Sequence, residues 1–359
     1  MNAARIGRQS FYLSKFFLIS HIMRIETNKS LRQYNTFGLD QKAAYFTEVS
    51  GDDQLREALL TAQKADIPVF ILGGGSNILL TRDLPYFVIK IAIKGIEIIR
   101  EDDRHTWVKV GAGEDWHDFV LYTIRQQLGG VENLSLIPGT VGASPMQNIG
   151  AYGVEIKDVF EQLEAVRRKD GGLVTFSATD CKFGYRDSIF KQEAKDTYAI
   201  THVIFRLDKF PVFNTTYGDI EFAMHELGYP EPSLEAVSEA VIHIRRKKLP
   251  DPAVWGNAGS FFKNPVITGD KFQQLKAIYP DLPGFSTPVG MKVPAAWLIE
   301  QAGWKGKRWG TIGVHAQQPL VLVNYGGGKG EDLLNLSKTI AKEVHEKFDV
   351  DLQTEVNLI

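Results

Sequence analysis

The sequence predicts a fold of mixed helices and strands, α/β or α+β, rather than an all-helical one. Two observations support this. Residues 43–93 switch between strand-like and helix-like apolar spacing, and residues 94–210 consist largely of strand-like runs. From about residue 235 the apolar residues change to helical spacing, which indicates a further region with a different architecture.

The first region is predicted to form a β-α-β unit. An alternating apolar stretch, 43–49, precedes a helix for which Ser50 is the expected N-cap, with Asp52 and Asp53 in the first turn. The predicted buried stripe of this helix consists of Leu55, Ala58, Leu59 and Ala62. The run VFILGGGSNILL (69–80) then predicts a strand, a glycine turn and a second apolar run, followed by the strand YFVIKIAI (86–93).

The second region is predicted to be rich in strands, and the third rich in helices. Strands are expected at 96–101, 107–113, 164–169, 173–178 and 199–207. A helix at 115–130 is expected to begin at Asp115 and to end at a glycine pair. Later helices are expected at 234–250, 270–280, 294–304 and 331–348, the last with Leu333, Leu336, Ile340, Val344 and Phe348 on one face. The closing stretch DLQTEVNLI (351–359) alternates apolar and polar residues, which predicts a half-buried strand.

Composition limits the class of protein. A length of 359 residues favours two or three domains, and 44% hydrophobic with 23% charged residues is ordinary for a globular protein. The net charge of -2 gives no general attraction to nucleic acid or to an anionic membrane, so neither partner is expected. One cysteine, Cys181, excludes a disulfide framework and a zinc ligand set, and it fits a cytoplasmic location.

The N-terminal stretch 4–23 combines basic residues with an apolar patch. Lys15 interrupts the patch and no small-residue cleavage site follows, so we expect a loosely ordered extension rather than a secretory signal. Met23 is a possible natural start. No apolar run reaches 18 residues, and no membrane-spanning helix is expected.

Two glycine-rich segments are candidate ligand sites. GGGSN (73–77) follows a predicted strand and could offer backbone N–H groups to an anion, although a plain tight turn explains it equally well. It matches neither the GxGxxG fingerprint nor the Walker loop. IPGTVGASPMQNIGAYG (137–153) has more permissive residues and fewer charges than an ordinary loop, which favours contact with a planar or pyrophosphate-bearing ligand.

Other candidates are isolated polar residues. Arg186 in GYRDS is either a guanidinium held in a packed site or a strand-end arginine paired with Asp187. Ser260 in GNAGSFFKNP (256–265) is either a turn residue or a hydroxyl placed against a ligand. Lys248 ends a basic helical run and could face a cleft, while His315 is more typical of a structural residue. No metal site is expected.

Eight segments occur in one order: NTFG (35–38), LGGGSN (72–77), IPGTVGASPMQNIGAYG, FGYRDS (183–188), TYGD (216–219), KLPDP (248–252), GNAGSFFKNP and TEV (354–356). This series, from about residue 34 to the end, resembles the UDP-N-acetylenolpyruvoylglucosamine reductase (UDP-N-acetylmuramate dehydrogenase) family. TTYGDI (215–220) resembles the tyrosine-bearing loop of its type I subgroup.

The resemblance implies an α+β fold with an FAD-binding core of the PCMH (vanillyl-alcohol-oxidase-like) type. Residues 1–30 would be the extension. FAD-binding subdomain 1 would be 31–93, joined by the C-terminal strand 350–359, and subdomain 2 with the tyrosine loop would be 94–230. A C-terminal substrate-binding domain would cover 235–349. A monomer is expected.

The resemblance also implies the reaction, in which NADPH and FAD reduce an enolpyruvyl nucleotide sugar to UDP-N-acetylmuramate for peptidoglycan. Arg186 and Glu355 match residues that stabilise an enolate, and Ser260 matches the family's proton donor. The implied FAD contacts are Gly73, Gly74, Gly75, Ser76, Asn77, Pro138, Gly139, Thr140, Gly142, Ala143, Ser144, Asn148, Gly150, Ala151, Tyr152 and Gly153.

The implied substrate contacts are Tyr217, Lys248, Asn264 and Gln318. One departure is Phe285, which stands where type I relatives have a tyrosine against the diphosphate. Two alternatives stay open: another PCMH-fold flavin oxidoreductase acting on a sugar or alcohol, and a non-catalytic flavin- or nucleotide-sugar-binding protein. The first glycine-rich segment lacks the histidine or cysteine to which many oxidases of that fold attach flavin.

Overall fold

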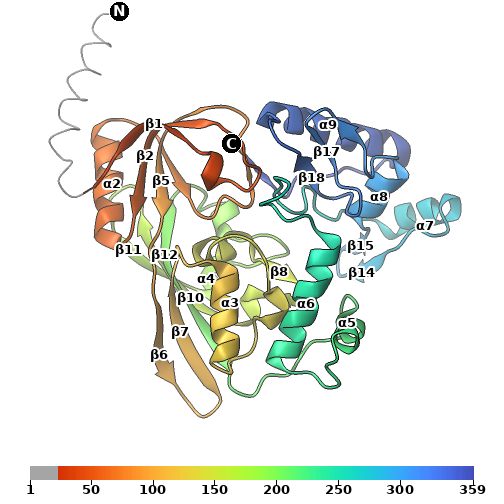
Figure 1. The fold of residues 1–359 in the computed structure, drawn as a ribbon, viewed down its shortest axis with the longest axis horizontal. Coiled ribbons are helices and arrows are strands. Elements are labelled where there is room, and N and C mark those ends of the chain that lie inside the picture. Colours follow the sequence, from red (N-terminus) through yellow and green to blue (C-terminus); the bar gives the residue numbers. More distant parts are fainter. Residues whose placement is uncertain (1–22) are drawn as a thin grey trace, which may run out of the picture. The chain divides into compact units, whose positions relative to one another are not determined.

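The computed structural model describes residues 23–359, which divide into two compact units (Figure 1). The first contains residues 23–29, 42–74 and 84–244, and the second contains 30–41, 75–83 and 245–359. Most of the predicted N-terminal extension lies outside the described residues, and so does the stretch considered as a secretory signal. The remainder of 1–30 includes the strand β1 (Glu26–Ser30). The domain boundaries taken from the resemblance stay a prediction.

The first unit contains a four-stranded sheet of order β1-β2-β5-β3. Its other strands are β2 (Lys42–Val49), β3 (Val69–Leu72) and β5 (Leu84–Ile91), and both β2 and β3 pair parallel to β5. Helix α2 (Asp52–Lys64) forms the crossover from β2 to β3, which run in the same direction on either side of β5. The predicted stripe of α2 is buried, so the β-α-β prediction is confirmed.

The expected N-cap of α2 is wrong by one residue. Gly51 occupies the cap with extended backbone and no capping side chain. The backbone N–H and the hydroxyl of Ser50 both donate to Gln54 Oε1, at 2.8 and 3.0 Å. A small polar residue shortly before two aspartates is the usual pattern of an N-cap, and it pointed to Ser50. The helix begins at Asp52, so the cap falls one position later, on Gly51.

A five-stranded antiparallel sheet of order β11-β10-β12-β7-β6 completes the main core of the first unit. Its strands are β6 (Ile96–Glu101), β7 (His105–Gly111), β10 (Phe160–Arg167), β11 (Leu173–Ser177) and β12 (Tyr198–Asp208). Each overlaps a predicted strand, although β10 begins at Phe160, four residues before its predicted range, and ends at Arg167. One hydrophobic cluster contains buried residues from both sheets and from α2 and α3 (Trp116–Arg125).

Short elements connect these sheets. They are η2 (Glu132–Leu134), η3 (Val141–Gln147), β8 (Gly150–Ala151), β9 (Val154–Glu155), η4 (Ile156–Asp158), α4 (Ala178–Cys181) and η5 (Ile189–Lys191). Helix α5 (Ile220–Glu226) and the first part of α6 (Leu234–Lys248) share a smaller apolar cluster.

The second unit is built from small sheets and helices. Its elements are η1 (Arg32–Tyr34), β4 (Ile78–Leu79), β13 (Val266–Ile267), α7 (Gly269–Ile278), β14 (Phe285–Thr287), β15 (Gly290–Lys292), α8 (Ala295–Gln301), β16 (Arg308–Trp309), β17 (Ile312–Val314), β18 (Leu322–Asn324), α9 (Gly330–Phe348) and β19 (Asn357–Leu358). Figure 1 shows α8 and α9 beside β17 and β18. The five predicted core residues of α9 are buried. The α+β prediction is confirmed.

The C-terminal segment differs from the predicted continuous strand, because it pairs with two partners in succession. Residues 353–355 lie antiparallel to 261–263, and β19 then pairs parallel to β4. Val356 is 2% exposed, whereas Leu358 is 44% exposed, so the expected apolar face does not extend to the end. No helix among residues 23–359 is long and apolar enough to cross a bilayer.

The caps of α2 and α3 predict different sensitivities to alanine. The Asp115 carboxylate accepts from the N–H groups of His117 and Asp118, so Asp115→Ala should destabilise the protein by about 1 kcal/mol. Ser50→Ala, at the position that is not the cap, should change stability by less than about 0.5 kcal/mol. Urea unfolding followed by circular dichroism measures both. Equal losses would contradict the assigned caps.

Candidate functional site

The two glycine-rich segments touch each other through their backbones in the first unit. A Cβ added to Gly74 would lie 2.7 Å from Gly139 Cα and 3.2 Å from the backbone N of Thr140. A Cβ on Gly73 would lie 3.1 Å from the Thr140 hydroxyl. Real Cβ atoms do not tolerate the first distance, so the approach requires glycine at position 74. The boundary between the two units falls directly after Gly74.

This contact contains a polar atom that is buried and unsatisfied. Thr140 is 9% exposed, and within residues 23–359 its hydroxyl oxygen has no hydrogen-bond partner. Buried hydroxyls are normally hydrogen-bonded, so an orphan of this kind indicates a ligand or water. Gly139, with φ of 125°, directly precedes it. The structure therefore offers a side-chain-free surface with one spare hydroxyl.

The other predicted cofactor residues continue from this contact. Gly142, Ala143 and Ser144 lie in η3, which ends at Asn148 in the left-handed region. The rest of the second segment is in or beside the β8–β9 hairpin and includes Gly150, Ala151, Tyr152 and Gly153. Pro138 is exposed before Gly139, and Gly75, Ser76 and Asn77 belong to the second unit. A Cβ on Gly75 would overlap the Tyr34 carbonyl, and its φ is +65°.

Arg186 is held against the second glycine-rich segment. It lies in a tight turn closed by hydrogen bonds between Gly184 and Asp187, with φ of 52°. Its guanidinium donates to the carbonyl oxygens of Gly150 and, at 3.5 Å, of Asn148. The side chain is 18% exposed. The structure therefore places Arg186 in a packed site on the predicted cofactor segment, while the Asp187 side chain accepts from Gln192.

Hydrogen bonds connect the tyrosine loop, which contains Tyr217, to the second glycine-rich segment. Asn133 Nδ2 donates to the carbonyl oxygens of Tyr152, at 3.1 Å, and Asn214, at 2.8 Å. A Cβ on Gly218 would lie 2.9 Å from the Tyr152 ring. Tyr217 itself is 53% exposed. The base of the loop is fixed, and its tyrosine faces solvent.

In the second unit the segment that follows Ser260 pairs with the segment that contains Glu355. The backbone N–H of Glu355 donates to the Phe261 carbonyl at 2.8 Å, and Phe262 bridges Thr354. Phe261 and Phe262 are 0% and 1% exposed and anchor the segment, whereas Ser260 and Glu355 are half-buried. The segments that contain Ser260 and Glu355 are far apart in sequence but neighbours in the second unit. Asn77 Nδ2 also donates to the Glu355 carbonyl at 3.3 Å.

The predicted substrate residues are distributed over the second unit, apart from Tyr217. Asn264 Oδ1 accepts from the backbone N–H of Ala295 at 2.9 Å. The carbonyl of Gln318 accepts from Val321, which bridges Ser260. Lys248 is exposed at the end of α6. Phe285, the departure noted above, is 52% exposed in β14.

His315 lies in the interior, as expected of a structural residue. Its Nδ1 accepts from the backbone N–H of Gln318 at 3.2 Å, and burial lowers its pKa. Its ring packs on Trp255. Across the described chain, no group of three or more histidine, cysteine, aspartate or glutamate residues could hold a metal ion.

Two residues that the sequence analysis did not select contact the predicted site. Asn133 joins the second glycine-rich segment to the tyrosine loop, as described above. Glu155 lies 3.7 Å from the Arg186 guanidinium, between Glu155 Oε1 and Arg186 Nη1. Glu155 follows the glycine-rich segment by two residues, but its proximity to Arg186 depends on tertiary pairing that no local pattern reveals.

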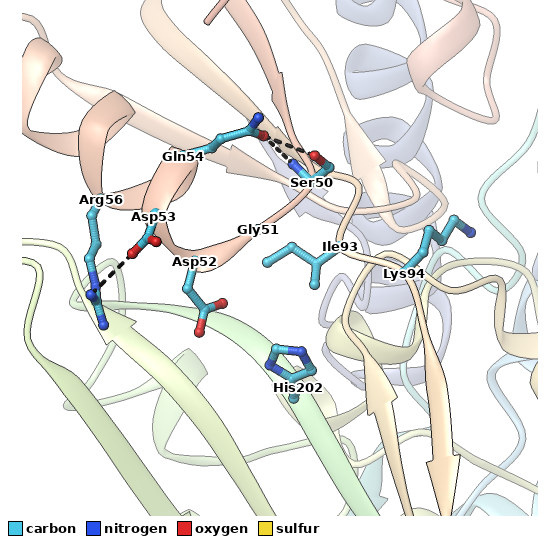
Figure 2. A pocket seen from close by; sticks show the side chains of 9 residues that line it. All are labelled: Ser50, Gly51, Asp52, Asp53, Gln54, Arg56, Ile93, Lys94 and His202. Carbon is cyan, nitrogen blue, oxygen red and sulfur yellow. Dashed lines mark hydrogen bonds and ion pairs between the residues drawn. The ribbon is translucent and has the colours of Figure 1, made fainter. Parts of the chain in front are cut away.

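A pocket of about 620 Å³ lies elsewhere in the first unit. It is lined by Ser50, Gly51, Asp52, Asp53, Gln54, Arg56, Ile93, Lys94 and His202 (Figure 2). None of these is a predicted site residue. Asp53 pairs with Arg56 at 3.4 Å, and Figure 2 shows the Asp52 carboxylate directed toward the His202 ring.

Comparisons with known proteins agree on one family. A family model described as "UDP-N-acetylenolpyruvoylglucosamine reductase, C-terminal domain" matches residues 251–359, and one described as "FAD binding domain" matches residues 43–177. The chain is 50% identical over 339 residues to UDP-N-acetylenolpyruvoylglucosamine reductase of Flavobacterium johnsoniae, covering 94% of this chain and 100% of that one. It is 48% identical over 336 residues to the enzyme of that name from Pseudomonas fluorescens, covering 93% and 99%.

A solved structure supports the fold. The crystal structure of UDP-N-acetylenolpyruvylglucosamine reductase from Thermus caldophilus matches with a TM-score of 0.65 at 24% identity, covering 94% of this chain and 99% of that one. The FAD-binding match includes the contact between Gly74 and Gly139. The glycine surface and the orphaned Thr140 hydroxyl fit a group with phosphate oxygens.

The close contact at Gly74 predicts that a single methyl group impairs FAD binding. Gly74→Ala would push Gly139 away, at a cost of roughly 1–3 kcal/mol for overpacking. The purified variant should therefore contain less FAD and bind it more weakly, as measured by absorbance and by fluorescence titration. Gly269→Ala is the control, because nothing lies within 4 Å of its added Cβ. Normal FAD content in Gly74→Ala would contradict the contact.

His202 predicts an acid sensitivity of stability. Burial lowers its pKa, Lys109 lowers it further, and Asp52 and Glu164 oppose these effects. Unfolded protein therefore binds more protons than folded protein, so the neutral ring's stabilisation is complete above about pH 6.5 and is lost as pH falls through the lower folded pKa.

His202→Gln should therefore flatten the fall in stability between about pH 7 and pH 5, by less than about 1.4 kcal/mol per pH unit, the limit for one proton. Urea unfolding midpoints at several pH values measure this slope. The exposed His225 on α5 provides the control substitution, His225→Gln. An unchanged slope in His202→Gln would contradict the assignment.

Proposed function

The chain belongs to the UDP-N-acetylenolpyruvoylglucosamine reductase family, and on this premise we propose that it catalyses the NADPH-dependent reduction of UDP-N-acetylglucosamine enolpyruvate to UDP-N-acetylmuramate. It is a flavin-dependent oxidoreductase of peptidoglycan synthesis, with an FAD-binding α+β core and a C-terminal domain of that family. The family resemblance predicted from the eight ordered segments is confirmed.

One observation supports the chemistry most directly: the residues that directly follow Ser260, 261–263, are hydrogen-bonded to residues 353–355. Reduction adds a hydride to C3 of the enolpyruvyl double bond and a proton to C2. Between these events, negative charge spreads over C2 and the adjacent carboxylate. Such charge is stabilised by donors that are already oriented before the reaction. A proton donor and a carboxyl group on adjacent, hydrogen-bonded segments meet this need.

In the proposed mechanism Ser260 donates the proton to C2. Its position is fixed because the next two residues, Phe261 and Phe262, are fully buried. Glu355 donates a hydrogen bond to the developing enolate, which requires the carboxyl group to be protonated. Arg186 supplies a permanent positive charge to the same anion. The Gly150 and Asn148 carbonyls restrict the guanidinium, so little reorientation is needed.

FAD would be held by the two glycine-rich segments, 73–77 and 137–153. When bound, FAD supplies hydride chemistry by accepting a hydride from NADPH and releasing it to the substrate. The protein contributes backbone N–H groups without side chains in the way, and the Thr140 hydroxyl as a hydrogen-bonding group.

The nucleotide sugar would be contacted by Tyr217, Lys248, Asn264 and Gln318. Tyr217 is exposed on a loop whose base is fixed, so it is available to a ligand. The exposed ammonium of Lys248 suits diphosphate oxygens. A monomer without nucleic-acid or membrane partners, and a cytoplasmic location, remain predictions.

Replacing the proton donor should separate the two half-reactions. Ser260→Ala should let NADPH reduce the flavin at the normal rate, but slow its reoxidation by the enolpyruvyl nucleotide by about 10²–10⁴-fold, the usual loss for a general acid. Stopped-flow flavin absorbance measures both steps. Ser50→Ala, which changes an exposed serine, is the control.

The outcomes distinguish the alternatives. Equal loss of both half-reactions, or normal turnover, would contradict the role of Ser260. Rapid oxidation of a sugar alcohol by O₂ would favour another flavin oxidoreductase. A colourless protein that cannot bind FAD would overturn the proposed function altogether.

A further inference from the structure

Glu155 lies directly opposite Gly150 in the β8–β9 hairpin. The register pairs Gly150 with Glu155, and the Arg186 guanidinium donates to the Gly150 carbonyl. A Cβ on Gly150 would lie 2.8 Å from Glu155 Cγ and 2.9 Å from Arg186 Nη1. The missing side chain at Gly150 is therefore what lets a carboxylate and a guanidinium share this place.

The Glu155 carboxylate is held firmly by several groups. Its Oε2 accepts from Asn148 Nδ2 at 3.0 Å and lies 2.7 Å from Lys157 Nζ. Its side chain also accepts from the backbone N–H of Asp158, in a reciprocal capping box at the start of η4. At 22% exposure the side chain is mostly shielded from water, which strengthens its interactions with nearby charges.

Asn148 connects this carboxylate to the Arg186 turn. Its Nδ2 also donates to the carbonyl of Gly184, at 3.0 Å, and Gly184 closes the turn that contains Arg186. Asn148 is fully buried, so the linkage is rigid. The carboxylate, the turn and the guanidinium are thereby fixed in one network.

Two cations and two carboxylates lie close together in this network. Arg186 and Lys157 each carry one positive charge, and Glu155 and Asp158 each carry one negative charge; the Asp158 carboxylate accepts from the Glu155 backbone N–H at 2.9 Å. Lys157 shares the carboxylate at the shorter distance, 2.7 Å against 3.7 Å for Arg186. Lys157 therefore offsets part of the Glu155 charge, and Glu155 can orient Arg186 without fully neutralising it.

We propose that Glu155 is a positioning residue for Arg186, which holds the guanidinium where it stabilises the developing enolate. This inference rests on the proposed function. Glu155 acts through Arg186 and does not touch the reacting atoms. Its removal should therefore weaken a step that uses Arg186 and leave hydride transfer from NADPH unchanged.

The test uses the FAD-loaded enzyme. Glu155→Gln keeps the size of the side chain and removes its charge. Flavin reduction by NADPH should keep its rate, and flavin reoxidation by the enolpyruvyl nucleotide should slow by about 10- to 100-fold, the effect of a small misplacement of a catalytic group. Glu193→Gln, in an exposed ion pair with Lys182, is the matched control and should alter neither rate.

A double-mutant cycle separates positioning from a general structural effect. In an Arg186→Ala background, Glu155→Gln should cause little further loss, because residues that act as a unit are not additive. Binding of the reaction product, which involves no turnover, should show the same dependence on Arg186. UDP-N-acetylmuramate should bind the oxidised Glu155→Gln enzyme more weakly in calorimetry, and the Arg186→Ala enzyme should show no added loss from Glu155→Gln.

The contrary results are distinct. The positioning role would be overturned by additive losses in the double mutant or by an equal slowing of both half-reactions. It would also be overturned if Glu155→Gln kept wild-type rates and product affinity. Failure of the proposed function would be seen first in the wild-type enzyme, whose reduced flavin would then not be reoxidised by the enolpyruvyl nucleotide.

Discussion

The approach of two backbone segments at Gly74 and Gly139 is the constraint on which the first unit's site depends. Without side chains at Gly73 and Gly74, the end of β3 can lie against residues 139 and 140. This contact fixes where the second glycine-rich segment begins. The segment then runs through η3 to the β8–β9 hairpin, which receives Arg186 at Gly150 and the tyrosine loop at Tyr152. One steric condition therefore determines the positions of several groups that are far apart in sequence.

The second unit uses a different principle to fix its groups, because it relies on burial. Fully burying a phenylalanine side chain stabilises a fold by about 1.5–3 kcal/mol, and Phe261 and Phe262 are both fully buried. Their backbone groups pair with residues 353–355. Two apolar side chains next to a polar one give Ser260 a fixed place at the edge of a core. The Glu355 backbone is held by the same pairing and by Asn77.

Periodic features of the sequence were predictable, and tertiary pairings were not. The stripe of α2 and the buried face of α9 follow from helical spacing alone, and Asp115 has the short acceptor that a cap needs. The prediction of Ser50 as the N-cap was wrong because the same residues allow the helix to start one position later. The alternation at 351–359 indicated an extended segment, but it could not reveal that the segment changes partners halfway.

The candidate site shows the same division. Glycine content marked both segments, and the order of the segments indicated the family. The physical reason for Gly74 became visible only beside Gly139, and Asn133 and Glu155 have no local pattern that distinguishes them from ordinary polar residues. Their importance comes from what they touch. A single sequence records which residues are present, whereas the contacts depend on how separate elements pack.

The backbone of Arg186 carries a cost that its surroundings must offset. Its φ of 52° lies in the left-handed region, at a turn position more typical of glycine or asparagine, and such a conformation costs on the order of 1–3 kcal/mol. The turn closes on itself through Gly184 and Asp187, the guanidinium bonds two carbonyls, and Glu155 lies beside it. A glycine would form this turn with less strain but would provide no charge. The turn, the two carbonyl contacts and Glu155 together hold this charged side chain against the second glycine-rich segment and offset the strain of its backbone.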